Sequence, residues 1–202
     1  MNVSLCVKCA AFPCADVRHA RFEVPGLPIR PETIKLILIS EAPPAQPGDG
    51  YYAGAAALFA QTTREAFNDA GADVGSVRDI LRLGVYLTTA VKCAKTSYLL
   101  RAATISECSR LLEKELALFP NVRALLLMGD AAILALNAIA RRAGQPRVIP
   151  AVPTYKLRGQ EFYFQGKRVF PSYLQAGPSF FIEKSKRKMI AEDIAAALAL
   201  IH

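Results

Sequence analysis

Three short apolar runs constrain the fold of this chain more than any other feature. They lie at residues 34–39, 85–91 and 122–128, and segments with helix-like patterns separate them. Each run is far shorter than the ~20 apolar residues that a membrane helix needs. Short runs without polar alternation are typical of strands that are covered on both faces. We therefore predict a three-layer α/β/α fold with a central, mainly parallel sheet of about four strands.

Local signals place the other elements around these strands. A helix is expected over 55–70, and Gly166 marks the turn of a hairpin. The segment Thr104–Glu107 fits a capping box, which predicts that a helix begins there. Asp130 is expected to be the N-cap of the next helix, and a last amphipathic helix is expected over 183–200.

The chain is expected to form a single domain over residues 1–202, because it contains no repeat and no linker-like segment. Its first part, about 1–30, is rich in Cys, Pro and Arg and has no periodicity, so we predict a loop-built arm. The N-terminus has no basic segment followed by a long apolar stretch, as a secretory signal would have. We therefore expect a cytoplasmic protein that makes no membrane contact.

Five cysteines in a chain without an export signal favour metal or redox chemistry over disulfides. Cys6 and Cys9 form a C-x2-C pair, Cys93 follows a predicted strand, and Cys108 is expected in the first turn of a helix. A helix N-terminus favours the negative charge of a thiolate. We predict that these four cysteines bind one inorganic centre. Their spacing leaves zinc, a [4Fe–4S] cluster and free buried thiols open, and Cys14 is interpreted as a small apolar side chain.

Several segments of the chain match the motifs of one known family in the same order. They are Cys6–Cys9, Arg21–Gly26, Ile39–Pro44, Tyr51–Gly54, Val91–Cys93 with Cys108, and Leu127–Ala132. In these motifs, and over nearly its whole length, the sequence resembles the iron–sulfur members of the uracil-DNA glycosylase superfamily. The resemblance implies a [4Fe–4S] cluster on the four cysteines, with zinc as the alternative.

The resemblance also implies a function. A monomer would bind single- or double-stranded DNA and take a flipped base into a pocket at the C-terminal ends of the strands. It would then cleave the N-glycosidic bond of uracil or of another deaminated or damaged base, as in base excision repair. The alternatives are a non-catalytic iron–sulfur protein that binds nucleic acid, and a zinc-stabilised interaction protein unrelated to DNA.

The loop after the first predicted strand would hold the catalytic groups. Where the family has an acid or an asparagine, Asp49 is the only carboxylate, and Gln46 could position a water. A simple turn residue is the alternative role for Asp49. Glu41 and Ala42, in the strand-end motif, are expected to line the substrate site. Tyr52 matches the phenylalanine that stacks on the base, although a core tyrosine would also fit.

Two positions depart from the family's pattern. Thr89 replaces the asparagine that reads the base, and a hydroxyl offers fewer directional contacts than an amide. The family's late H-P-S motif matches 177–179 or the segment 171–175, and neither contains histidine. Gln175, Ser179 or backbone N–H groups are therefore expected to stabilise the departing base.

Lysine and arginine exceed the acids by 25 to 17, a net charge of +8, which favours polyanionic partners or a basic, soluble surface. Phe180 and Phe181 precede a basic cluster, which suits a wedge into stacked bases flanked by phosphate contacts. Lys184, Lys186 and Arg187 are the predicted DNA contacts. A solvated helix face is the alternative. Further candidates for phosphate contacts are Lys92, Lys95 and Arg101.

Overall fold

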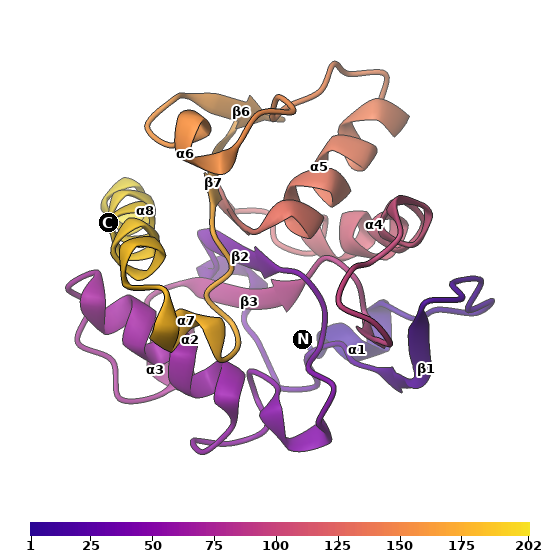
Figure 1. Cartoon of the computed structure of the whole chain (residues 1–202), viewed down its shortest axis with the longest axis horizontal. Helices are drawn as coiled ribbons and strands as arrows, with labels where there is room; N and C mark the ends of the chain where they lie inside the picture. Colours follow the sequence, from indigo (N-terminus) through magenta and orange to yellow (C-terminus); the bar gives the residue numbers. More distant parts are fainter.

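A five-stranded sheet in the order β3-β2-β5-β7-β6 forms the centre of the computed structural model, which describes all 202 residues (Figure 1). Its strands are β2 (Leu36–Ser40), β3 (Val85–Thr89), β5 (Ala124–Met128), β6 (Phe162–Phe164) and β7 (Lys167–Ser172). The pairs β3–β2, β2–β5 and β5–β7 are parallel, and β6 is antiparallel to β7. The predicted α/β fold is confirmed, with five strands rather than about four because the hairpin supplies two.

Helices cover both faces of this sheet, which explains why its strands show no polar alternation. One face packs against α4 (Ala102–Leu116) and α5 (Asp130–Arg142), and the other against α2 (Leu58–Asp69), α3 (Val77–Arg82) and α8 (Lys184–Ile201). No residue of β2, β3 or β5 is more than slightly exposed. The short helices are α1 (Val3–Cys6), α6 (Thr154–Leu157) and α7 (Ser179–Ile182), with 3-10 turns η1 (Pro31–Thr33) and η2 (Pro47–Asp49). None of the helices has the length and apolar character that crossing a membrane requires.

The N-terminal arm is more ordered than the predicted loop. Besides α1 it contains β1 (Val17–Phe22), which pairs antiparallel with β4 (Cys93–Lys95) in a separate two-stranded sheet. The prediction was wrong because the partner of β1 is remote in sequence, and the register shifts between Arg18 and Phe22. A strand stabilised by such a pairing leaves little local periodicity.

The predicted caps of two helices were also wrong. Helix α4 begins at Ala102, so Thr104 lies inside it and Cys108 lies beyond its first turn. Asp16 of the arm caps this helix instead: its carboxylate accepts from the Arg101 N–H at 2.7 Å and from the Thr104 hydroxyl. In α5, Asp130 is the first helical residue and Gly129, at φ 92°, is the N-cap. The arm therefore holds the N-terminus of α4.

A fully buried ion pair joins the segment between β3 and β4 to α4. The Lys92 ammonium contacts the Glu115 carboxylate, and both side chains are inaccessible to solvent. The same carboxylate accepts from the Tyr86 hydroxyl at 2.6 Å and the Thr88 hydroxyl at 2.9 Å. The Lys92 ammonium also donates to the Thr88 hydroxyl and to the Thr89 carbonyl. Lys92 is therefore a structural residue, and its proposed phosphate contact was wrong.

We predict that Glu115→Gln destabilises the fold strongly, because the substitution leaves the Lys92 charge buried without its counterion. Breaking a buried pair in this way typically costs about 3–5 kcal/mol. The free energy of unfolding in urea would measure the loss. The same change at the exposed Glu107, on the same helix, should cost less than about 0.5 kcal/mol. Equal stability of the two variants would contradict the structural role of the pair.

Candidate functional site

A small cavity lies beside the ends of β2 and β3, where the C-terminal ends of parallel strands meet. In an open α/β sheet this edge is where ligands bind. The cavity measures about 20 Å³, and a single water needs roughly 10–15 Å³. Its polar lining includes Glu23, Thr88, Thr89, Tyr51 and Tyr52. Two residues predicted for the substrate site, Tyr52 and Thr89, are therefore brought together, while Glu23 was missed.

Two neighbouring tyrosines form one wall of this cavity. The Tyr52 hydroxyl donates to the Leu87 carbonyl and accepts from the Leu87 N–H, both at 3.1 Å. Because β3 is an edge strand, these groups would otherwise have no partner in the sheet. The Tyr51 hydroxyl accepts from the Gln175 amide at 2.9 Å. Burial raises the pKa of both tyrosine hydroxyls well above the usual range, so both stay protonated.

The other residues predicted in the loop after β2 lie outside this cavity. The Glu41 carboxylate pairs with the Lys95 ammonium at 2.9 Å, and Ala42 is buried beside it. Asp49 accepts from the Leu58 N–H at 3.4 Å, at the start of α2. Gln46 is exposed and makes no side-chain hydrogen bond. Gly50 of this loop therefore lines the cavity, whereas the predicted catalytic side chains of the loop do not.

The predicted replacements for histidine also lie away from the cavity. Gln175 is fully buried behind Tyr51, and its amide nitrogen donates to the Tyr51 and Thr63 hydroxyls. Its amide oxygen is buried without a partner. Ser179 is exposed at the first position of α7. Gln175 is thus connected to the cavity only through Tyr51.

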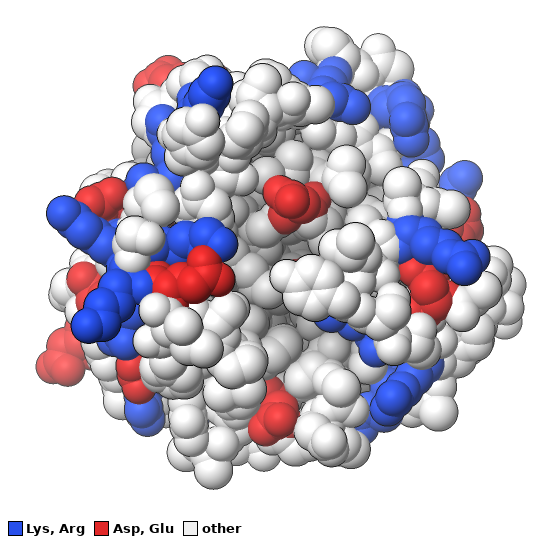
Figure 2. Space-filling view, viewed as in Figure 1, with Lys and Arg blue, Asp and Glu red and all other residues white.

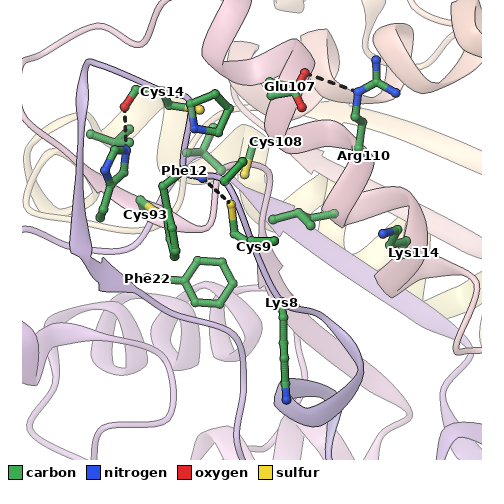
Figure 3. Close-up of a pocket in the computed structure, with 17 residues that line it drawn as sticks. Lys8, Cys9, Phe12, Cys14, Phe22, Cys93, Glu107, Cys108, Arg110 and Lys114 are labelled. Carbon is green, nitrogen blue, oxygen red and sulfur yellow. Dashed lines mark hydrogen bonds and ion pairs between the residues drawn. The ribbon is translucent and has the colours of Figure 1, made fainter.

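A second, larger cavity of about 240 Å³ lies between the arm and α4. The cysteines that line it are Cys9, Cys14, Cys93 and Cys108, whose side chains Figure 3 shows around one space. Cys6 is exposed and does not line this cavity. The structure therefore places Cys14 where the prediction placed Cys6.

The local backbone explains this exchange. Cys6 is the last residue of α1, whereas Cys9 follows the helix, so the two side chains point in different directions. The chain then reverses at Phe12, whose φ of 45° is rare for a bulky residue, and the Phe12 N–H donates to the Cys9 sulfur at 3.4 Å. This turn brings Cys14 back beside Cys9.

The four thiols line one space, and two of them are buried. Burial, together with the neighbouring sulfurs, raises the pKa of Cys93 to about 12. Burial also raises the pKa of Cys108 to about 11, although the Lys92 N–H and charge lower it in part. The Lys92 N–H donates to the Cys108 sulfur at 3.1 Å. No group of three or more Cys, His, Asp or Glu side chains is arranged to hold a single metal ion. The cavity exceeds the ~150 Å³ that admits a benzene, so the space and the sulfur donors fit a polynuclear cluster.

The three predicted DNA contacts differ in whether their charges are already paired within the chain. Arg187 binds the Asp69 carboxylate through two nitrogens at 2.5 and 3.0 Å, and its guanidinium lies 4.8 Å from the Phe180 ring centre. Lys186 pairs with Glu183, and only Lys184 is exposed without an ion-pair partner. Figure 2 shows Lys and Arg mainly around the edge of a face whose hollowed centre is mostly uncharged.

The predicted aromatic wedge is also shifted along the chain. Phe180 is a core residue at 2% exposure, whereas Phe181 is 42% and Ile182 is 77% exposed. The side chains available to enter a base stack at α7 are therefore Phe181 and Ile182.

We predict that Arg187→Gln lowers stability, whereas Lys184→Gln does not. The arginine ties α8 to α2 through a bidentate ion pair and a ring contact, together worth roughly 1–2 kcal/mol. Urea unfolding would show the difference, and salt-dependent DNA binding would show whether the lysine alone contributes phosphate attraction. Unchanged stability of Arg187→Gln, together with weakened DNA binding, would contradict this assignment.

Comparison with known proteins places this geometry in a family. The model of the Uracil DNA glycosylase superfamily matches residues 28–194. A solved structure described as the wild-type UNG crystal structure from Nitratifractor salsuginis shares 16% identity, with a TM-score of 0.37, over 84% of this chain and 75% of that one. No curated protein matches significantly. Because the family match spans most of the chain, the protein belongs to the uracil DNA glycosylase superfamily.

Proposed function

We propose that the protein is a DNA glycosylase that hydrolyses the N-glycosidic bond of uracil or of another deaminated or damaged base. The observation that carries this proposal is the superfamily match over 28–194, which includes the strand ends around the one-water cavity. Members of this superfamily act on a base that has left the helix. The water-sized space at the strand ends could hold the water that attacks the sugar.

The residues around the cavity suit the reading of a base. Tyr52 is half-buried and fixed against β3, so its ring offers a rigid stacking surface. Thr89 ends β3 and would contact the base edge through one hydroxyl. Because a hydroxyl cannot match both a donor and an acceptor as fully as an amide, this site favours a broader range of bases than uracil alone.

One observation favours a second candidate, a nucleic-acid-binding protein of the same fold without glycosylase activity. Neither predicted donor for the departing base, Gln175 or Ser179, lines the cavity. Loss of one transition-state donor typically costs about 3 kcal/mol, or roughly a hundredfold or more in rate. A site without any such donor could retain DNA binding and lose turnover. A monomeric state and a cytoplasmic location stay predictions.

Excision assays separate these candidates. We expect the protein to release at least one base from single-stranded or duplex oligonucleotides that carry uracil, hypoxanthine or xanthine. Thr89→Val, which removes the hydroxyl and keeps the shape, should lower kcat/KM about tenfold, the effect of losing one hydrogen bond of about 1.4 kcal/mol. Thr33→Val, at an exposed position in η1 where the hydroxyl bonds only to the nearby Arg30 carbonyl, is the matched control. Tight binding to every oligonucleotide without any excision would favour the non-catalytic candidate.

We propose further that Cys9, Cys14, Cys93 and Cys108 hold a [4Fe–4S] cluster, with zinc as the alternative. Four thiolates are the usual ligand set of such a cluster. When bound, it would fasten the arm to α4 and β4, since two ligands come from the arm, one from β4 and one from α4. Its contribution would be to folding, because ligands from separate segments are brought together only in the folded chain.

The cysteine that the structure exchanges provides the test. Cys14→Ala is expected to lose the iron and the visible absorbance of anaerobically purified protein, together with thermal stability. Cys6→Ala is the matched control and should keep both, because its thiol is outside the cavity. Metal analysis of the parent distinguishes iron from zinc. Loss of iron from Cys6→Ala with retention in Cys14→Ala would instead support the ligand set first predicted.

A further inference from the structure

Most carboxylates near the strand ends are committed to partners within the chain, and Glu23 is the one carboxylate that lines the small cavity. The committed ones are Glu41 with Lys95, Asp49 with the Leu58 N–H, Glu115 with Lys92, and Asp193 with Arg158. The Glu23 carboxylate lines the one-water cavity and makes no hydrogen bond or ion pair with the rest of the chain. A carboxylate without a partner in this position is free to act on a molecule in the cavity.

The backbone holds Glu23 in place. It directly follows β1, and its N–H donates to the Lys92 carbonyl at 2.7 Å. A Cβ added at Gly50 would lie 2.5 Å from a Glu23 carboxylate oxygen, although the Gly50 φ of −69° suits any residue. The carboxylate therefore lies directly against the backbone of the loop after β2, and a side chain at position 50 would displace it.

The surroundings of Glu23 suit a general base, a group that accepts a proton, more than a surface charge. Burial raises the pKa of its carboxyl, and the Arg21 charge lowers it in part. The tyrosine hydroxyls that share the cavity stay neutral. A carboxylate whose pKa is moved toward working pH is a more effective proton acceptor. A water in the adjacent space would have this carboxylate and the groups of Thr88 and Thr89 within the same small volume.

We propose that Glu23 is the general base of the glycosylase reaction, a step that rests on the function proposed above. Its carboxylate accepts a proton from the water in the cavity as the water oxygen bonds to C1′ of the sugar. The C1′–N bond breaks, and its electron pair leaves with the base. The base anion then takes up a proton, either from the carboxyl of Glu23 or from solvent, so that the net reaction adds one water across the bond.

Glu23 lies before residue 28, where the family match begins. The general base of the reaction would therefore come from the arm and not from the loop after β2, where Asp49 is the predicted catalyst. The pairing of Phe22 with Cys93 joins this part of the arm to the cysteine cavity. The arm would thus supply a catalytic group as well as two metal ligands.

Single-turnover excision with DNA in excess tests the role of Glu23. Glu23→Gln keeps the shape of the side chain and should lower the rate by about 10²–10⁴-fold, the usual contribution of a general base, with DNA affinity and thermal stability retained. Glu32→Gln, the same change at an exposed site in η1, is the matched control. Gly50→Ala should also slow the reaction, because its methyl group displaces the carboxylate while its backbone is unstrained.

The pH profile adds a readout that a structural role would not change. The parent rate should rise with pH as the Glu23 carboxyl ionises, at a pH above the usual range for glutamate, and Glu23→Gln should lose this rise. A parent that excises bases while Glu23→Gln stays within threefold would overturn the proposal, as would a large loss confined to Asp49→Asn. A parent that excises no base in the panel would instead refute the proposed function, and this inference with it.

Discussion

The fully buried pair of Lys92 and Glu115 is the interaction on which the other features of the site depend. Charges removed from water are costly to bury, so this pair persists only with the hydrogen bonds that surround it. Its ammonium binds the Thr89 carbonyl at the end of β3. The backbone of the same lysine donates to the Cys108 sulfur and accepts from the Glu23 N–H. One residue therefore connects β3, the cysteine cavity and the arm.

This connection gives the arm a function beyond covering the sheet. Asp16 caps α4, and β1 pairs with β4, so the arm is fixed at both sides of the cysteine cavity. A metal cluster there would raise the cost of releasing the arm, because its ligands come from separate segments. Loss of the cluster would then disturb the position of Glu23 without any direct contact between the two. We interpret the cysteine cavity as support for the active site and not as a reacting centre.

The sequence predicts what depends on neighbouring residues and fails where the partner is remote. The buried strands and the hairpin at Gly166 follow from local apolar runs and turn chemistry. The cap from Asp16 to α4 does not, because the partners are far apart in the chain. The turn at Phe12 could not be predicted either, since a bulky residue seldom adopts positive φ. As a result, no local pattern indicates that Cys14 lies beside Cys9, or that Arg187 joins α8 to α2 through Asp69.

The absence of histidine from the site bears on which base it can release. Around the cavity, the tyrosine hydroxyls are bound to Leu87 and Gln175, and the donors of Gln175 are already used. The Thr89 hydroxyl and backbone N–H groups of the adjoining loops are then the remaining donors for the departing base. A general base accelerates the attack of water but does nothing for the charge that develops on the leaving group. If the proposed function and the proposed role of Glu23 hold, the site would stabilise charge at the sugar more than at the base. Such a site would suit bases that depart more readily than uracil, such as purine deamination products.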